Sequence, residues 1–337
     1  MAKHDNTETV SSEKAEGKDL AEHELVSIVT MTYKNFKGLR KTMDSVLRQD
    51  YPRIEYIVAD DCSPAFDADR VRDYIMAHKG PNVENVIVMK HEENVGTVKN
   101  LNRAYQAASG TIVMPLSCGD YFWQEDVVSR IVQRFHDTDA NAIVTRRVAI
   151  DMDTRKMYYI PDERSAKKLV RMQDDKSGRV SAHIRQYRNY MTKRLYDAAS
   201  GSVLALKRNR LEGMGWFDED YRLLEDSPFF LKFLYEEPLC CAMDIVSIGY
   251  ATNGVSGKTK NPILVQDDIR VIRTAKQEHL DALDPVTRDW VKNEYLRTTA
   301  ESKGAFMRAC ALHPVGFTLF AGQVAKGIAK EKINAGR

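Results

Sequence analysis

The chain has 337 residues, of which 43% are apolar, so it can fold as one large α/β domain with an appendage or as two domains. Its 50 basic and 48 acidic residues leave a formal net charge of +2, which gives no whole-chain case for binding nucleic acid. The five cysteines contain no CxxC pair, which argues against a disulfide framework and a structural zinc site and fits a reducing compartment.

Neither end of the sequence has the pattern of a membrane or secretion signal. Residues 1–23 are polar and charged without an apolar stretch, so we expect a disordered leader and a cytoplasmic protein. The apolar stretch from Arg308 to Lys326 is broken by His313 and Pro314, and it is too short to span a bilayer of about 30 Å. No transmembrane helix is predicted.

Strands and helices alternate along the first half of the chain. Continuous apolar runs predict buried strands, and apolar residues spaced three or four apart predict helices between them. The expected strands are 25–31, 54–59, 86–90, 111–116 and 142–150, and the expected helices lie within 36–47, 71–77, 98–108 and 127–135. This alternation is typical of a doubly wound sheet. Neither GxGxxG after the first strand nor GxxxxGK[ST] is present, so no glycine-rich phosphate loop is expected.

Three acidic segments lie at predicted strand ends or at a helix start. Asp60 and Asp61 follow one strand, Asp120 follows another, and Glu225 and Asp226 precede a helix that begins near a proline. Because the carboxyl ends of strands frame the ligand crevice of an open α/β sheet, the three segments suggest one site. Two simpler alternatives remain open: a solvated turn for Asp120, and charge compensation at a helix end for the acidic pair.

The rest of the chain is predicted to be largely helical. Residues 151–199 carry clustered Lys and Arg among Tyr and Met, and we interpret them as an inserted helical segment. It is either a solvated helix pair or a surface that receives a phosphate-bearing acceptor or an anionic membrane. Strands are expected at 202–206 and 240–250, and helices follow to the end of the chain. Residues 314–332 predict either a membrane-surface helix or a helix packed on the domain.

The ordered segments VSIVTMTYKN, IEYIVADDCS, ENVGTVKNLNRAYQAASGTIV, LSCGDYF and GWFDEDYRLLEDSPFFLK resemble glycosyltransferase family 2 over roughly residues 25–255. This family contains the inverting nucleotide-sugar transferases of the GT-A fold. The resemblance implies an α/β fold in which a doubly wound mixed sheet is flanked by helices. The expected parts are a GT-A domain at 24–257, with an acceptor-side insertion at 151–199, and a helical C-terminal region at 258–337.

The resemblance also implies a donor site. Thr30 and Tyr33 would line the nucleobase, and Asp61, supported by Asp60, would accept a hydrogen bond from a base N–H. A carboxylate only accepts hydrogen bonds, so it suits the imide of uracil or thymine. The resemblance implies UDP as the default nucleotide, and dTDP, whose thymine has the same imide, is the alternative.

A second group of residues would hold the diphosphate. Asn94, Gly96, Lys99 and Asn100 match the family's donor-binding segment, in which Lys99 replaces the usual arginine and loses its bidentate geometry. Asp120 matches the last acid of the family's metal motif, which usually reads D-S-D-D but reads S-C-G-D here. We therefore expect a divalent cation, Mg²⁺ or Mn²⁺, to bind weakly.

The catalytic residues follow from the same resemblance. Asp226 matches the catalytic base and Glu225 would orient the acceptor, whereas Trp216 would either stack on an acceptor sugar or anchor the core. The implied function is transfer of a hexosyl or N-acetylhexosaminyl group to a hydroxyl of a glycan or lipid-linked acceptor. The expected process is polysaccharide or cell-surface glycan synthesis in a bacterium, in the cytoplasm or peripherally at the inner face of the membrane. The alternative, suggested by the reduced metal motif, is a catalytically inactive nucleotide-sugar-binding scaffold.

Overall fold

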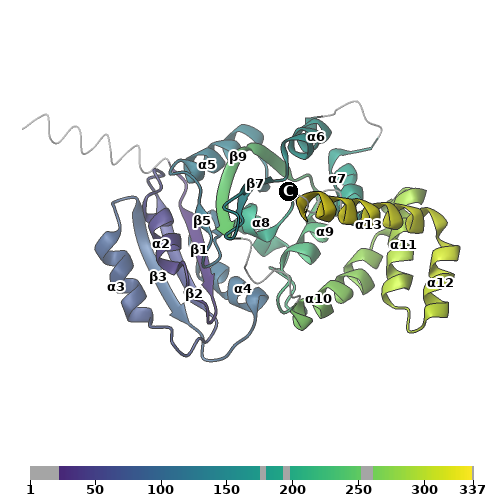
Figure 1. Ribbon diagram of the computed structural model, residues 1–337. Coiled ribbons are helices and arrows are strands. Elements are labelled where there is room, and N and C mark those ends of the chain that lie inside the picture. Colours follow the sequence, from purple (N-terminus) through teal and green to yellow (C-terminus); the bar gives the residue numbers. More distant parts are fainter. Residues whose placement is uncertain (1–22, 175–179, 193–197, 252–260, 336–337) are drawn as a thin grey trace, which may run out of the picture.

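The computed structural model describes residues 23–174, 180–192, 198–251 and 261–335. The predicted leader at 1–23 lies outside these ranges except for its last residue. Within the described residues a nine-stranded sheet carries helices on both faces, and a group of helices extends from one end of the molecule (Figure 1).

The sheet is mixed, with the strand order β3-β2-β1-β4-β8-β6-β9-β5, and β7 pairs with β6. Strands β1 to β4 are mutually parallel, β8 is antiparallel to both β4 and β6, β9 is parallel to β6, and β5 is antiparallel to β9. The strands are β1 (Val26–Thr32), β2 (Ile54–Asp60), β3 (Val83–Lys90), β4 (Ile112–Pro115), β5 (Tyr121–Phe122), β6 (Ala142–Ile150), β7 (Met157–Ile160), β8 (Leu204–Lys207) and β9 (Cys240–Ala251). The predicted mixed α/β architecture is confirmed.

Burial on both faces explains why the first strands read as continuous apolar runs. Every residue of β2 is buried, as is almost every residue of β1, because helices cover the sheet on either side. Each covering helix buries one apolar stripe, as α5 does with Val127, Ile131 and Phe135. These helices are α2 (Leu39–Leu47), α3 (Ala68–His78), α4 (Thr97–Ala107) and α5 (Val127–Thr138).

The strand register brings several loops to one edge of the sheet. Thr32 pairs with Asp60, and Asp60 pairs with Lys90, so β1, β2 and β3 end together. Strand β8 runs antiparallel to β4, so Gly201, just before β8, lies at this same edge. Strand β6 is antiparallel to β8, so its carboxyl end also points there. We refer to this border as the carboxyl edge.

The segment 151–199 is only partly helical, which corrects the expectation of a helical insertion. It begins with β7, which pairs antiparallel with the part of β6 that extends beyond β8. The sequence Met-Tyr-Tyr-Ile favours a strand, and the free border of β6 supplies its hydrogen-bonding partner. Two helices follow, α6 (Glu163–Asp174) and α7 (Ala182–Met191).

The C-terminal region is helical, as predicted, and α13 packs against α11. The chain continues through η1 (Gly201–Val203), α8 (Arg208–Gly213), α9 (Asp226–Glu236), α10 (Pro262–Arg273), η2 (Ala275–Gln277), η3 (Leu280–Ala282), α11 (Pro285–Thr298), α12 (Lys303–Leu312) and α13 (Pro314–Ala335). A buried ion pair between Lys276 and Glu294, 2.6 Å apart, helps to fix this region, and Lys276 also donates to the Met191 carbonyl of α7. Across the described ranges, no helix is both long and apolar enough to cross a bilayer.

Candidate active site

The side chain of Asp60 supports the carboxyl edge from behind. Its carboxylate accepts hydrogen bonds from the backbone N–H of Ser63 at 2.6 Å and from the Ser63 hydroxyl at 2.7 Å. That hydroxyl in turn accepts the backbone N–H of Lys34, in the loop after β1, at 2.7 Å. Fully buried Asp60 therefore ties the loop after β2 to the loop after β1. Tyr33, in the latter loop, exposes 41% of its surface, so its ring is accessible to a ligand.

Asp61 holds the loop between β3 and α4. Its carboxylate accepts the side-chain N–H of Asn94 at 2.6 Å and the backbone N–H groups of Val95 and Gly96 at 2.8 and 2.9 Å. Gly96 has a φ of +93°, and a Cβ there would lie 2.5 Å from the Arg222 carbonyl oxygen, so the position requires glycine. A carboxylate has about four acceptor positions. Asp61 therefore has one acceptor position unused by these three donors, at a residue that is 3% exposed.

Arg222 and Asp267 connect this loop to the acidic pair. The Arg222 guanidinium donates to the Asn94 backbone carbonyl at 2.9 Å and also contacts the Asn94 side-chain carbonyl. One oxygen of buried Asp267, on α10, accepts the three backbone N–H groups of residues 222–224 at 3.0, 2.7 and 3.2 Å. Because Glu225 comes next in the chain, α10 fixes the approach to the acidic pair.

The loop that carries Asp120 is held by α2. The Thr42 hydroxyl donates to the Asp120 backbone carbonyl at 2.6 Å and accepts the Gly119 N–H at 3.0 Å. A Cβ on Gly38, whose φ is +92°, would lie 3.0 Å from the Gly119 Cα, so glycine allows the close approach of helix and loop. The backbone of Asp120 is thus fixed, while its carboxylate makes no hydrogen bond with the described residues.

The environment of Asp120 fits a weakly held divalent cation. Burial raises the pKa of Asp120 to about 7, and the charge of Arg147 limits this rise. An acidic side chain without a hydrogen-bond partner has both oxygens available as hard ligands. No cluster of three His, Cys, Asp or Glu side chains suited to a metal ion occurs in the described part of the chain. A cation held by Asp120 would therefore take further ligands from donor phosphates and water.

The acidic pair lies at the start of α9, against Gly201. The Asp226 carboxylate accepts the Gly201 N–H at 3.1 Å and the Ser227 hydroxyl at 3.4 Å. A Cβ on Gly201 would lie 2.5 Å from a carboxylate oxygen of Glu225, so glycine gives both acids room. Since Gly201 is at the carboxyl edge, the fold brings the acidic pair to the same border as Asp61.

The two acids of the pair have different surroundings. Burial and the neighbouring charge of Asp226 raise the pKa of Glu225. Burial also raises the pKa of Asp226, but the hydrogen bonds from Gly201 and Ser227 and the charge of Arg147 lower it. These interactions therefore oppose the rise in the pKa of Asp226 that burial causes.

Arg147, on β6, is a site residue that the sequence analysis missed. Its positive charge lowers the pKa of both Asp120 and Asp226. Its Nη1 donates to the Ser202 hydroxyl at 3.2 Å, whereas its buried Nε has no hydrogen-bond partner among the described residues. A buried N–H without a partner costs about 1–3 kcal/mol, so a bound anion would be favoured here. The signal in the sequence was an Arg-Arg pair inside an otherwise apolar strand.

Two residues expected to bind the donor are buried behind the carboxyl edge. Thr30 lies within β1, and its hydroxyl shares a hydrogen bond with the Tyr56 hydroxyl at 3.0 Å. Asn100, on α4, donates to the Ala59 carbonyl at 3.2 Å and contacts His91 Nε2 at 2.9 Å. Both side chains hold the edge together and do not reach its surface.

Lys99 and Trp216 each contact a charged residue. The Lys99 ammonium lies 4.0 Å from the Glu219 carboxylate. The Trp216 ring packs against the core, with the Arg208 guanidinium 5.5 Å from its centre. The backbone N–H of Arg208 donates to the Thr111 carbonyl just before β4, at the opposite edge of the sheet. The structure therefore does not bring Trp216 to the acidic pair.

Comparisons with curated proteins relate this chain to bacterial glycosyltransferases. It is 33% identical over 106 residues to the putative teichuronic acid biosynthesis glycosyltransferase TuaG of Bacillus subtilis, covering 32% of this chain and 40% of TuaG. It is 26% identical over 212 residues to the uncharacterized glycosyltransferase EpsJ of the same organism, covering 63% and 56% of the two chains. The chain thus spans about half the length of the curated relatives it matches.

Solved structures share the fold at low sequence identity. Staphylococcus aureus TarS, residues 1–349 in complex with UDP-GlcNAc, superposes with a TM-score of 0.59 at 18% identity, covering 85% of this chain and 79% of that one. The mannosyltransferase PcManGT of Pyrobaculum calidifontis, in complex with GDP-Man and Mn²⁺, superposes with a TM-score of 0.54 at 17% identity. The match covers 95% of this chain and 87% of PcManGT. The model of glycosyl transferase family 2 matches residues 27–196, just over half of the chain. On this match, together with the GT-A fold, the chain belongs to glycosyltransferase family 2.

Proposed function

We propose that this chain is an inverting glycosyltransferase that moves a hexosyl or N-acetylhexosaminyl group from a nucleotide diphosphate sugar to an acceptor hydroxyl. One observation carries the proposal: neighbouring residues 201 and 202 connect the acidic pair to Arg147, because the Gly201 N–H donates to the Asp226 carboxylate at 3.1 Å and the Ser202 hydroxyl accepts from the Arg147 guanidinium at 3.2 Å. Removal of a proton needs a carboxylate base, which Asp226 can supply. Departure of the diphosphate needs positive groups, which a cation at Asp120 and the unsatisfied N–H of Arg147 can supply.

In the proposed reaction Asp226 is the general base. The acceptor oxygen attacks the anomeric carbon from the face opposite the diphosphate, and its proton passes to Asp226. The bond between that carbon and the diphosphate oxygen breaks, and the nucleoside diphosphate leaves with the electron pair. Arg147 would stabilise the developing negative charge through its Nε. A divalent cation held by Asp120, when bound, would neutralise further charge on the diphosphate.

UDP is the proposed nucleotide, and dTDP is its alternative. Support comes from Asp61, which retains an acceptor position for an imide N–H, and from Tyr33, whose exposed ring can stack on a base. The TarS neighbour was solved with UDP-GlcNAc, so UDP-GlcNAc is the first donor to test.

The proposed acceptor is a hydroxyl of a glycan or lipid-linked glycan of a bacterial surface polysaccharide. The name of the TuaG relative, which refers to teichuronic acid biosynthesis, supports this class. The second candidate function is a catalytically inactive nucleotide-sugar-binding scaffold. It is favoured by one observation, the single carboxylate of the S-C-G-D segment where the family pattern has three.

Nucleotide titration tests the donor site. We expect calorimetry to show binding of UDP or dTDP, stronger with Mg²⁺ or Mn²⁺ than with EDTA, and no binding of GDP or CDP. Asp120→Asn keeps the shape of the side chain but removes its charge, so it should abolish the metal-dependent part of the affinity. Asp139→Asn, at a fully exposed side chain just after α5, is the matched control and should bind like the parent.

Two outcomes of this titration would contradict the assignment. Equal affinity for UDP or dTDP with the metal ion and with EDTA would show that Asp120 does not bind a cation that contributes to donor binding. Absence of binding for all four nucleotides would remove the donor site itself. Nucleotide binding without transfer to any glycan or lipid-linked acceptor would instead support the scaffold.

Asp267 gives a separate test of the contact between α10 and the site. In Asp267→Ala three N–H groups lose a buried acceptor, at a cost of about 1–3 kcal/mol, so the loops around Asn94 and Glu225 should loosen. We expect kcat/KM for the donor to fall about tenfold or more, and Asp267→Asn, which keeps an acceptor oxygen, to restore most of it. Gln266→Ala, on the exposed side of α10, is the control. A lower melting temperature with unchanged kcat and KM would show that Asp267 serves stability alone.

A further inference from the structure

Strand β7 carries exposed aromatic side chains beside the carboxyl edge. Tyr158 and Tyr159 are 46% and 49% exposed, and Met157 is 58% exposed. The strand pairs antiparallel with the part of β6 that begins at Arg147, so it extends the sheet beyond the end of β8. Exposed large apolar side chains that gather in this way usually mark a binding surface.

The two tyrosines of β7 lie on opposite faces of the sheet. Tyr159 lies on the face of Arg146, whose guanidinium is 5.0 Å from the centre of the Tyr159 ring. Neighbouring residues of a strand point to opposite faces, so the Tyr158 ring lies on the other face. Ala149 of β6 pairs with Tyr158 on one side and with Tyr250 of β9 on the other, so these three residues share that face.

The face that carries Tyr158 is the face of the candidate site. The Arg147 guanidinium lies 5.8 Å from the centre of the Tyr250 ring, so Arg147 is on this face as well. Arg147 also donates to the Ser202 hydroxyl at 3.2 Å, and the residue before Ser202 donates its N–H to the Asp226 carboxylate at 3.1 Å. Tyr158 is therefore on the same side of the sheet as the proposed base.

The strand order shows which substrate Tyr158 can reach. Strand β9 pairs with one border of β6 over residues 143–150, so β8 and β7 both pair with the other border. Asp120, the expected cation ligand, immediately precedes β5, which lies beyond β9. Gly201, which binds Asp226, lies just before β8. The diphosphate would therefore lie towards β5, whereas β7 lies on the side of the base.

An inverting transfer places the two substrates on opposite sides of the anomeric carbon. The acceptor oxygen approaches from the face away from the diphosphate, so it must enter from the side of Asp226. Tyr158 lies on that side, one strand spacing of about 5 Å beyond β6. An exposed ring at this position is beside the entering acceptor.

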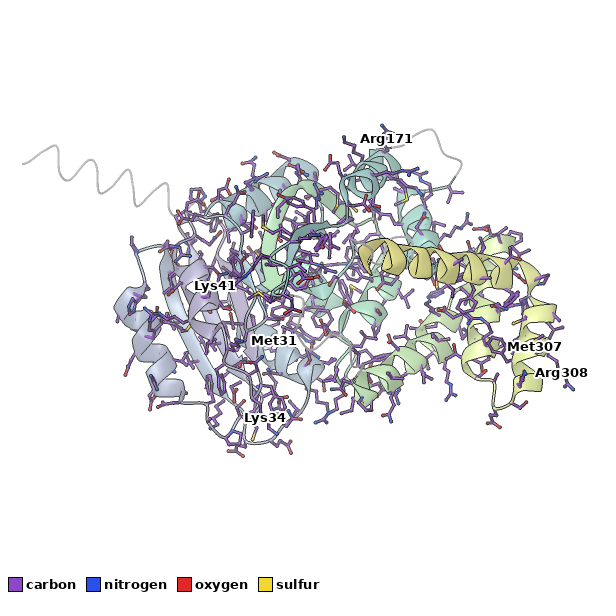
Figure 2. All side chains as sticks on the ribbon, viewed as in Figure 1. Met31, Lys34, Lys41, Arg171, Met307 and Arg308 are labelled. Atoms are coloured by element: carbon purple, nitrogen blue, oxygen red, sulfur yellow. The ribbon has the colours of Figure 1, made fainter. Side chains whose placement is uncertain are left out.

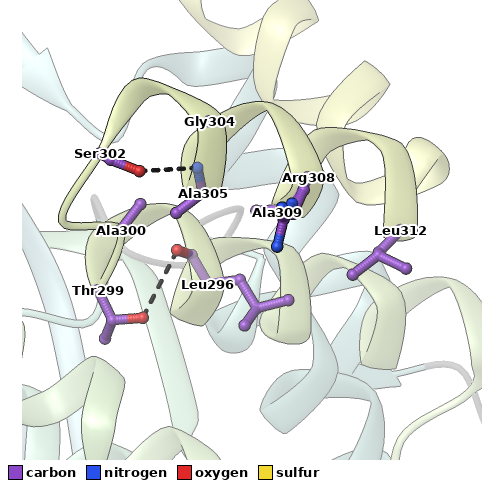
Figure 3. A pocket seen from close by; sticks show the side chains of 9 residues that line it. All are labelled: Leu296, Thr299, Ala300, Ser302, Gly304, Ala305, Arg308, Ala309 and Leu312. Carbon is purple, nitrogen blue, oxygen red and sulfur yellow. Dashed lines mark hydrogen bonds between the residues drawn. The ribbon is translucent and has the colours of Figure 1, made fainter.

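The groove in the C-terminal helices offers no comparable ring. Met307 and Arg308 lie together at the far end of these helices, remote from β7 (Figure 1, Figure 2). A groove of about 440 Å³ lies between the end of α11 and α12, beside Arg308 (Figure 3). Leu296 and Leu312 contribute to its walls, and among the described residues that line it none is aromatic. Of these two places, β7 is the one that adjoins the candidate site.

We propose that Tyr158 is an acceptor-binding residue, whose ring stacks on a pyranose unit next to the one that carries the attacking hydroxyl. The C–H groups on one face of a pyranose carry a small positive charge, so they suit the negative face of an aromatic ring. The phenol hydroxyl can exchange hydrogen bonds with sugar hydroxyls. The occupant is therefore a saccharide of at least two units, and the inference rests on the proposed function.

NMR titration of saccharides into the full chain without a donor tests this subsite apart from transfer. The probes are glucose with cellotetraose, and N-acetylglucosamine with chitotetraose. We expect at least one tetrasaccharide to bind more tightly than its monosaccharide. Tyr158→Ala should raise the Kd of that tetrasaccharide about five- to tenfold, and Tyr158→Phe, which keeps the ring, should stay within about twofold of the parent.

Tyr159→Ala is the matched control. It removes the same type of side chain, with nearly the same exposure, from the next position of β7, but on the opposite face of the sheet. Its affinity for the tetrasaccharide should equal that of the parent. UDP titration by Tyr158→Ala should also match the parent, which separates loss of the ring from loss of the fold.

Three results would overturn the proposal. They are absence of binding by both tetrasaccharides, equal weakening in Tyr158→Ala and Tyr159→Ala, and a dimer of the parent that both alanine variants dissociate. The last result would assign β7 to pairing with a second copy. Tetrasaccharide binding that depends on Tyr158, without transfer from any donor, would support the saccharide subsite and contradict the proposed function.

Discussion

Replacing Asp226 by asparagine is expected to lower kcat about 10²- to 10⁴-fold, the contribution of a well-placed general base. Asparagine keeps an oxygen that can accept the Gly201 N–H, so the loop geometry should persist while the proton acceptor is lost. The donor KM and the calorimetric affinity for UDP should therefore stay within about twofold of the parent, since the missing interaction belongs to the transition state.

The controls for this experiment come from the same loop. Asp218→Asn changes an exposed aspartate of the segment before the acidic pair, and transfer should be unaffected. Glu225→Gln should reduce the rate less than Asp226→Asn does, because we assign Glu225 to orienting the acceptor. Retention of transfer in Asp226→Asn within about tenfold of the parent would mean that another group takes the proton.

The pH dependence follows from the surroundings of the pair. Burial raises the pKa of Asp226, and the base works only when it is ionised, so the rate should rise with pH along an acid limb above the ordinary aspartate range. The contribution of Asp226 to folding stability changes with pH in the opposite direction to the rate. An acid whose pKa is raised in the folded state binds protons more tightly there, so its contribution is present at low pH and declines as pH rises through the folded pKa.

The parallel half of the fold could be predicted from local patterns. Strands β1 and β2 are buried on both faces, so most of their consecutive residues must be apolar, and this run is visible in the sequence. Strand β5 has two residues, and β7 is an exposed strand at a border, so neither leaves a clear pattern. These short pieces exist because β9 and β6 offer unpaired backbone groups, which only the assembled sheet supplies.

The candidate site was predictable where it depends on strand ends and helix starts. Asp61 and Asp226 lie at such positions, and the topology brings both to the carboxyl edge. Asp267 acts from 43 to 45 residues away in sequence, so no local spacing could identify it. For Thr30 the motif position suggested a ligand contact, and the structure places the residue within β1, buried, with two further residues before the strand end.

Substitution of Arg147 is the second change that we expect to lower kcat strongly. Arg147→Gln removes a positive charge and a buried N–H that would face the departing diphosphate, so kcat should fall about 10²- to 10³-fold. Arg147→Lys keeps the positive charge but lacks the planar guanidinium, so its kcat should lie between that of Arg147→Gln and that of the parent. Arg146→Gln is a matched control, since the Arg146 guanidinium pairs with Glu163 at 3.0 Å and donates to the Pro161 carbonyl.

The pH profile separates a role in the site from a structural one. The Arg147 charge lowers the pKa of Asp226, so its removal should shift the acid limb of the rate profile to higher pH. The control Arg146→Gln should leave the limb in place. If Arg147→Gln lowered the melting temperature and the rate but left the limb unchanged, its guanidinium would not face the base in the working enzyme. A shift to higher pH together with a rate loss that Arg147→Lys partly restores would instead link one charge to both proton removal and diphosphate departure.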